Sequence, residues 1–410
     1  MLKNLISSFF TKFLVAFSSL GILLISSRYL GGAIVGQISL VILNIAIIQT
    51  VNEIYTGSAL VYFIPKMPFK KLYQIGFIWT LICILILNGI FIVFKIGASE
   101  LWLHVLFLSF MITLQAFHAV ILLAKQNIKV YNFLTLSQPL LLLLTLVFSV
   151  FILKVDNINA YLIAIYTSSG ITFLISTSYM IKLVNATPLI TEKLSWKQVF
   201  SNGLINQLGN LAHTLSSRYN YYMIGGSLLV GVYASASSLT ESVWIISGSV
   251  SPIILTHIAN QKDMPNNGRV TFLLSKICFL LSLICIAILV IIPAEFFNWL
   301  LGKDFTGIKT IMLYLSPGIL VISFSSIISH YFSGLGRQRI LLIANGSGLL
   351  VTLATSYYFI QQFGLIGACY SASLSYFMQA LVLSAAFMKV NKFSFNQLFS
   401  FKKDLSLLKN

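Results

Sequence analysis

Polar residues recur along one side of the segment SNGLINQLGNLAHTLSSRYNYY, residues 201–222. At 100° per residue of helix, its amide, imidazole and hydroxyl side chains fall within an arc of about 80°. These residues are Asn202, Asn206, Asn210, His213 and Ser217. Arg218 widens the stripe on one flank, and leucines occupy the opposite side. The stripe can hydrogen-bond water or hydroxyl groups, and Arg218 can bind an anion through paired N–H donors.

A helix of this kind cannot turn its polar side to lipid, so the stripe lines water, a ligand or another helix. Hydrogen bonding between helices is the simpler interpretation, at about 1 kcal/mol or less per bond. It would explain a single Asn. Five residues that end beside an arginine favour a cavity wall instead. We therefore take Asn206, Asn210, His213 and Ser217 as candidate binding residues.

Two carboxylates lie inside apolar segments. One belongs to a two-turn polar stripe made of Gln49, Asn52, Glu53 and Thr56. The other, Glu241, shares a helix face with Ser237 and Trp244. An ionised carboxylate in mid-membrane costs roughly 2.5–3.5 kcal/mol. We take Glu53 and Glu241 as candidates for coupling to an ion, H⁺ or Na⁺, and Gln49 and Asn52 as binding candidates. A structural ion pair with a neighbouring Arg or Lys is the alternative for both carboxylates.

Four basic residues are candidates for contact with an anion: Lys12, Arg28, Lys125 and Arg218. Lys12 shares a helix face with Ser19. The alternative to contact with an anion is that Lys12 extends its ammonium group to the lipid headgroups. Arg28 comes at the end of the first apolar segment, where an interfacial position is the alternative. The five histidines have no zinc-site spacing and the four cysteines form no CxxC pair, so we predict no metal, disulfide or cofactor.

Apolar segments of about 20 residues position all of these groups. The 410 residues are 58% hydrophobic and only 9% charged, which excludes an ordinary soluble domain. Because backbone groups in lipid must be satisfied within each segment, we predict an all-α polytopic membrane protein. Its twelve expected transmembrane helices cover roughly 10–28, 35–63, 73–94, 101–124, 134–153, 160–181, 202–226, 231–258, 270–292, 308–332, 340–360 and 366–388.

The net charge of +17 follows from the topology of these spans. With the N-terminus in the cytoplasm, most of the 26 Lys and Arg fall at cytoplasmic ends. The exceptions are Arg28, Lys95, Lys154, Arg218, Lys303 and Lys309. The positive-inside rule thus predicts a membrane protein with both termini in the cytoplasm. Binding to nucleic acid is not needed to explain the charge.

Two short motifs repeat in the same order in the two halves of the chain. VGQIS (35–39) and VGVYA (230–234) begin the second and eighth spans, and AKQNI (124–128) and GRQRI (336–340) precede the fifth and eleventh. This favours two pseudo-symmetric six-helix lobes, residues 1–181 and 201–388. A cytoplasmic linker, 182–200, would join them, and a basic cytoplasmic tail, 389–410, would follow. The lobe interface is then the expected place for a central cavity.

Three further stretches carry a family resemblance: RYLGGAIVGQIS (28–39), LLGKDFTGIKTIMLYLSPGIL (300–320) and FGLIGACYSASLSY (363–376). They resemble the polysaccharide-transporter branch of the multidrug/oligosaccharidyl-lipid/polysaccharide (MOP) exporter superfamily, and most of all its O-antigen flippases of the Wzx type. The likeness covers essentially the whole chain.

The resemblance implies a MATE-like fold and alternating access. It implies that an undecaprenyl-diphosphate-linked oligosaccharide is flipped from the cytoplasmic to the periplasmic leaflet, with the polysaccharide polymerase, chain-length proteins and membrane lipids as partners. We expect a monomer and no enzymatic activity. In this interpretation the basic residues replace the hydration shell of the diphosphate, and the amides and hydroxyls bind sugar.

Two other functions fit a multi-pass membrane chain. A drug or cation antiporter of the same superfamily would keep the fold, but its cavity should be rich in acids and aromatics. A membrane glycosyltransferase or polymerase would need a substantial extramembrane loop with acidic or Arg clusters. The short loops of this chain argue against that enzyme, and the excess of basic over acidic residues favours an anionic cargo.

Overall fold

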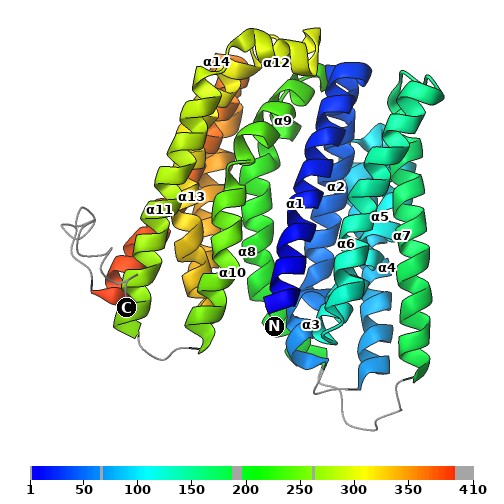
Figure 1. Ribbon diagram of the computed structural model, residues 1–410, viewed down its shortest axis with the longest axis vertical. Coiled ribbons are helices and arrows are strands. Elements are labelled where there is room, and N and C mark those ends of the chain that lie inside the picture. Colours follow the sequence, from blue (N-terminus) through cyan, green and yellow to red (C-terminus); the bar gives the residue numbers. More distant parts are fainter. Residues whose placement is uncertain (1, 65–67, 187–195, 261–263, 393–410) are drawn as a thin grey trace. The chain divides into compact units, whose positions relative to one another are not determined.

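The computed structural model describes residues 2–64, 68–186, 196–260 and 264–392, which are helical apart from their short connections (Figure 1). The first half contains α1 (Leu2–Ile25), the π-helical turn η1 (Ser26–Leu30), α2 (Gly32–Thr56), α3 (Ser58–Phe63), α4 (Phe69–Val93), η2 (Ser99–Leu101), α5 (Trp102–Ala124), α6 (Ile128–Val147), η3 (Phe148–Ile152) and α7 (Ile158–Ala186). The second half contains α8 (Trp196–Met223), α9 (Ser227–Glu241), α10 (Trp244–Asn260), α11 (Met264–Ile291), α12 (Ala294–Leu301), η4 (Lys303–Phe305), α13 (Ile308–Gly334) and α14 (Gln338–Asn391).

The helices confirm an all-α, multi-pass membrane protein. Nine helices in the described residues are long and apolar enough to cross a bilayer, and α9 with α10 forms a tenth, bent candidate. The 54-residue α14 counts once in that number but contains the two expected spans 340–360 and 366–388. The remaining expected span is α8, whose polar stripe lowers its hydropathy. Its 28 residues are still long enough to cross a bilayer.

The two parts of α14 fold back on one another around Gly364. This glycine has φ of +57°, a conformation that a side chain would strain. Residues before Gly364 bond residues after it. The hydroxyl groups of Ser356 and Ser371 lie 2.9 Å apart, and Ser375 Oγ donates to the carbonyl of Gly348 at 2.9 Å. Pairs that converge towards Gly364 in this way define an antiparallel hairpin of two helices.

Two of the longest expected spans are broken. Residues 35–63 divide at Gly57 into α2 and α3. Residues 231–258 divide after Glu241, where α9 and α10 meet at a bend of 50°. Thr240 Oγ1, within α9, and Ser242 Oγ, directly after it, both donate to carbonyls of α9, at 2.7 Å to Ala236 and 2.7 Å to Leu239. Hydroxyl groups that compete for backbone carbonyls in this way favour bending of a helix.

The chain divides into two compact units. Unit 1 contains Met1–Leu211, Gly225–Val232 and Asn298–Phe305, and unit 2 contains Ala212–Ile224, Tyr233–Phe297 and Thr306–Asn410. Each has its own buried apolar cluster, which includes Leu72 and Phe117 in unit 1 and Tyr331 and Phe387 in unit 2. The boundary falls within α8. The lobes 1–181 and 201–388 therefore stay a prediction, and residues 187–195 and 393–410 of the expected linker and tail lie outside the described residues.

Glycines from the two repeated motifs meet inside unit 1, where α2 and α9 touch through their backbones. A Cβ atom on Gly36 would lie 1.8 Å from the carbonyl oxygen of Ser227, and one on Gly231 would lie 1.9 Å from that of Gly32. Small residues four apart on both helices permit such an approach. The Asp304 carboxylate accepts the backbone N–H of Gly32 at 2.9 Å and so caps the start of α2.

Candidate functional site

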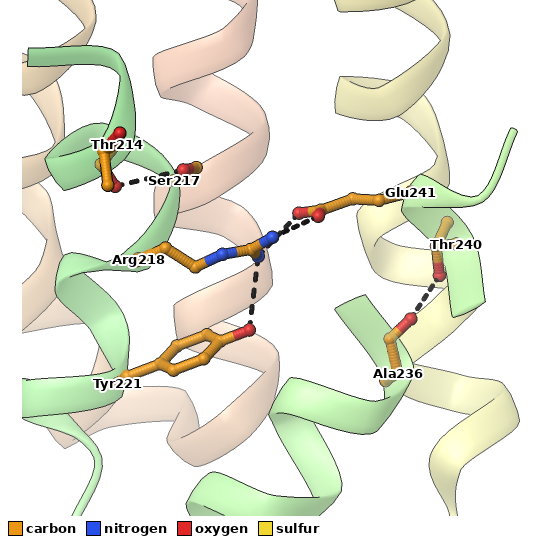
Figure 2. Close-up of polar contacts among 7 residues, drawn as sticks. All are labelled: Thr214, Ser217, Arg218, Tyr221, Ala236, Thr240 and Glu241. Carbon is orange, nitrogen blue, oxygen red and sulfur yellow. Dashed lines mark hydrogen bonds and ion pairs between the residues drawn. The ribbon is translucent and has the colours of Figure 1, made fainter. Parts of the chain in front are cut away.

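Arg218 and Glu241 form an ion pair inside unit 2 (Figure 2). Arg218 projects from the last turns of α8, and Glu241 is the final residue of α9, at the helix break. Arg218 Nη1 donates to Glu241 Oε1 at 2.7 Å, and Nη2 donates to Oε2. This parallel pair of bonds is the strong, directional geometry of an arginine–carboxylate contact. It matches the structural alternative that the sequence left open for Glu241.

One aromatic side chain contacts the ion pair, and two more pack against each other in the same unit. The guanidinium carbon of Arg218 lies 5.4 Å from the ring centre of Tyr221, whose hydroxyl also accepts a bond from Nη1 at 3.2 Å. Trp244, the first residue of α10, packs edge-on against Tyr376 with ring centres 5.9 Å apart. Its indole N–H is buried and has no partner within the described residues. The side chains of Arg218 and Glu241 keep exposed fractions of 26% and 11%.

A second polar contact joins α8 to α14. His213 Nδ1 lies 3.2 Å from Gln379 Oε1, so the ring nitrogen must be the donor. Gln379 is fully buried, and its Nε2 donates to Ser216 Oγ at 3.0 Å. A Cβ atom on Gly348 would lie 2.4 Å from that same nitrogen, so the small residue makes room for the glutamine. His213 therefore bonds another helix, and its side chain is half-buried.

The other residues of the α8 stripe have different surroundings. Ser217 is buried and donates to the carbonyl of Thr214 within its own helix. Asn210 is exposed and donates to Gln207 Oε1 at 2.9 Å, and Asn206 is half-buried. The side chain of Asn202 lies outside the described residues. The stripe is thus partly a packing surface and partly exposed, and its role as a cavity wall stays a prediction.

In unit 1 the polar stripe of α2 pairs with itself. Gln49 Nε2 donates to Glu53 Oε1 at 3.1 Å, and Asn52 Nδ2 donates to Thr56 Oγ1 at 2.8 Å. The side chain of Asn52 is buried, and its Oδ1 has no partner within the described part of the chain. Within the described residues, Glu53 makes no ion pair and its carboxylate is bonded by a neutral amide.

The start of α8 lies against the same end of α2. A Cβ atom on Gly203 would lie 1.8 Å from the carbonyl oxygen of Ile54, and one on Gly57 would lie 2.9 Å from Gln207 Nε2. Gln207 itself is buried. The break between α2 and α3 therefore packs against the polar side of α8 within unit 1.

The remaining basic candidates lie at the ends or on the surface of unit 1. Lys12 is exposed on α1. Arg28 is exposed in η1, and its guanidinium carbon lies 5.4 Å from the Trp299 ring centre of α12. Lys125, directly after α5, places its ammonium 4.5 Å from the ring centre of Phe69. These cation–π contacts are worth about 0.5–1 kcal/mol where exposed. Contact of these three residues with an anion stays a prediction.

The structure therefore brings together Arg218 and Glu241 in one unit, and Gln49 with Glu53 in the other. Sequence reasoning missed Gln379 as the partner of His213, and the packing of Trp244 against Tyr376. Gln379 was detectable as a lone amide within an apolar span, but its register against His213 was not. The described residues contain no cluster of three His, Cys, Asp or Glu side chains that could hold a metal ion.

No family model matches the sequence, and no curated protein matches it. Solved structures do resemble the fold. The lipid II flippase MurJ, in an inward closed conformation, has a TM-score of 0.72 and 15% identity over 99% of this chain and 96% of its own. A Vibrio cholerae MATE transporter has a TM-score of 0.67 and 14% identity over 95% of this chain and 97% of its own.

A third structure is an inward-facing multidrug resistance MATE family transporter of the MOP superfamily. It has a TM-score of 0.66 and 16% identity, covering 97% of this chain and 96% of its own. Identities this low say nothing of a shared cargo, but the coverage extends over nearly all of each chain. The chain therefore has the fold that the lipid II flippase and the MATE transporters share.

Proposed function

We propose that this protein is a transporter that flips an undecaprenyl-diphosphate-linked oligosaccharide across the inner membrane by alternating access. Arg218 is the observation that carries the proposal. An arginine within a membrane-spanning helix is costly, and such residues mark substrate or ion pathways. Arg218 retains exposure of 26%, and its bonds to Glu241 and Tyr221 use three of its five N–H donors. A guanidinium in this state suits phosphate oxygens.

The polar groups near the helix ends and along α8 would take the rest of the cargo. Asn206, Asn210 and Gln49 are partly or fully exposed amides, which suit sugar hydroxyls. Lys12, Arg28 and Lys125 are exposed cations that would guide a diphosphate along the way. The isoprenoid tail needs no internal site because it can stay in the bilayer. In this proposal both termini are cytoplasmic, and the polymerase and chain-length proteins act next on the flipped product.

We also propose that transport is coupled to H⁺ or Na⁺. Glu53 is the better candidate of the two carboxylates because it bonds a neutral amide, 3.1 Å away, and no cation within the described residues. Glu241 is held by Arg218. A carboxylate without a paired cation can gain or lose a proton without breaking an ion pair.

Complementation tests the proposed function. A strain that lacks its O-antigen flippase should regain surface polysaccharide when the protein is expressed, and its undecaprenyl-linked intermediate should stop accumulating. Arg218→Ala, Asn210→Ala and Lys12→Ala should each lower this rescue at normal expression. Lys154→Ala, which removes an exposed cation outside the candidate site, is the control and should rescue fully. Full rescue by all three variants would refute the assignment of the site.

A drug or cation antiporter is the second candidate, because the MATE transporters share the fold and two carboxylates lie within the spans. An ethidium accumulation assay separates the two functions. The antiporter would lower intracellular ethidium in a pump-deficient strain, and a flippase would leave it unchanged.

A further inference from the structure

Glu241 occupies the place that an anionic group of the cargo would need. Its two carboxylate oxygens engage two different nitrogens of Arg218, at 2.7 Å for the Nη1–Oε1 bond. A phosphate group would use the same pair of parallel N–H donors. The Nη1–Nη2 edge cannot hold both anions in this way, so a phosphate that binds this edge competes with the Glu241 carboxylate.

The position of Glu241 in the chain allows its side chain to move away from Arg218. It is the last residue of α9, and the helix changes direction by 50° before α10. In the connection the backbone hydrogen bonds change from a spacing of four residues to one of three. The N–H of Ser242 donates to the carbonyl of Ser238 at 3.1 Å, and the N–H of Val243 donates to that of Thr240 at 3.4 Å. A side chain at such a break can be displaced with less disruption of helical bonds than one in a helix interior.

A second donor for the displaced carboxylate lies nearby in sequence. Trp244 follows three residues after Glu241, and its buried indole N–H has no partner within the described residues. A buried unpaired donor is destabilising, by the cost of its lost hydration. Binding of the freed carboxylate would satisfy this donor. Tyr221 meanwhile contacts the Arg218 guanidinium through its hydroxyl at 3.2 Å and through its ring, and would keep the guanidinium in place.

We propose that the Glu241 carboxylate occupies the binding position of the cargo anion. It bonds Arg218 when no cargo is bound, and an isoprenoid diphosphate displaces it. This rests on the proposed function for the choice of anion. Glu241 is then a positioning residue that competes with cargo, and its removal has the opposite effect on binding from the removal of Arg218.

Binding of farnesyl diphosphate to the purified full-length protein in detergent tests this competition. Glu241→Gln keeps the size of the side chain but removes its charge. The variant side chain competes less strongly for Arg218 than the carboxylate does, so we expect farnesyl diphosphate to bind about tenfold more tightly. Arg218→Gln should abolish saturable binding. Glu295→Gln, at an exposed carboxylate in the first turn of α12, makes the same change in net charge and should leave affinity as in the wild type.

Two further measurements keep the outcome clear. The double variant Arg218→Gln/Glu241→Gln removes both charges, so it should unfold near the wild-type temperature yet bind no diphosphate. Farnesol in place of farnesyl diphosphate should show no difference among the variants, and inorganic pyrophosphate should show the same order as the lipid. Equal or weaker diphosphate binding by Glu241→Gln, or no binding by any form, would overturn the proposal.

The result separates this inference from the proposed function. If complementation fails while Glu241→Gln still tightens diphosphate binding, the competition stands and the cargo assignment falls. If complementation succeeds and Glu241→Gln weakens binding, the cargo assignment stands and Glu241 is a structural counter-ion only.

Discussion

The buried polar networks of the two units differ in charge. In unit 1, Tyr73, His118 and Ser176 connect α4, α5 and α7 through bonds of 3.2 and 3.0 Å. Ser176 donates its own hydroxyl hydrogen to a backbone carbonyl, so it accepts from His118 Nδ1–H, and Nε2 accepts from Tyr73. A neutral imidazole satisfies every bond of this chain. Unit 2 has a comparable neutral contact at His213 and Gln379, but it adds the Arg218–Glu241 ion pair.

This difference indicates a division of roles. A neutral, fully bonded network fixes the packing of helices and has little reason to rearrange. An ion pair at a helix break has two partners that can each bind something else. We therefore expect substitutions in the Tyr73–His118–Ser176 network to change stability, and substitutions around Arg218 to change stability and transport together.

Arg218→Gln should have the largest effect. Removing one partner of a buried ion pair costs about 3–5 kcal/mol, and the partial exposure of this pair lowers the expected loss of unfolding free energy to about 2–3 kcal/mol. Thermal unfolding of the protein in detergent measures the loss, and complementation should fail as well. The double variant with Glu241→Gln is the control, because it should recover most of the stability and none of the transport. An unchanged unfolding temperature for Arg218→Gln would mean that the ion pair contributes nothing.

Gln379→Leu should come next. Gln379 is fully buried, and its replacement leaves His213 and Ser216 without their shared partner. We expect the free energy of unfolding to fall by about 2 kcal/mol. It also disturbs the helix that carries Arg218, so transport should fall at normal expression. Gln379→Glu, of similar size, is the informative comparison, since it keeps an acceptor for His213. Full transport by Gln379→Leu would show that the charged and neutral contacts of unit 2 act independently.

Much of the fold could be predicted from the amino-acid composition. Long apolar segments and the distribution of Lys and Arg were enough for an all-α, multi-pass chain, and the repeated VGQIS and VGVYA motifs located two glycines that meet in the structure. The breaks at Gly57 and after Glu241 were not foreseen, because each lies inside a single long expected span, and the polar residues beside it were interpreted as a stripe on a continuous helix. The short α12 was missed for a related reason: its eight residues are too few to stand out as a span.

The candidate site followed from the sequence only in part. The periodicity of α8 placed His213, Ser217 and Arg218 on adjoining faces, because helical geometry is local. The partners of those residues depend on which helix packs against α8 and in what register. Glu241 lies 23 residues from Arg218 and Gln379 lies 166 from His213, and no local pattern encodes such a pairing.

His118→Leu should destabilise unit 1 by about 1–2 kcal/mol, because Tyr73 and Ser176 lose their common partner. Transport per folded molecule should remain close to wild type, since the network holds no charge. His118→Gln, which can still bond both neighbours, should recover part of the stability. The measurement is thermal unfolding beside complementation at matched expression. Loss of transport with wild-type stability would contradict the view that this network serves packing alone.

Glu53→Gln should change stability least. Its carboxylate bonds Gln49 one helical turn away, and such a pair contributes about 0.2–0.5 kcal/mol, most of which an amide can retain. The unfolding temperature should therefore be nearly unchanged. If Glu53 couples transport to an ion, the variant should transport at a rate that no longer responds to an imposed H⁺ or Na⁺ gradient, measured in proteoliposomes with a fluorescent lipid-linked cargo. A retained response would exclude Glu53 and return the coupling role to unit 2, where Glu241 would have to release Arg218 in every cycle.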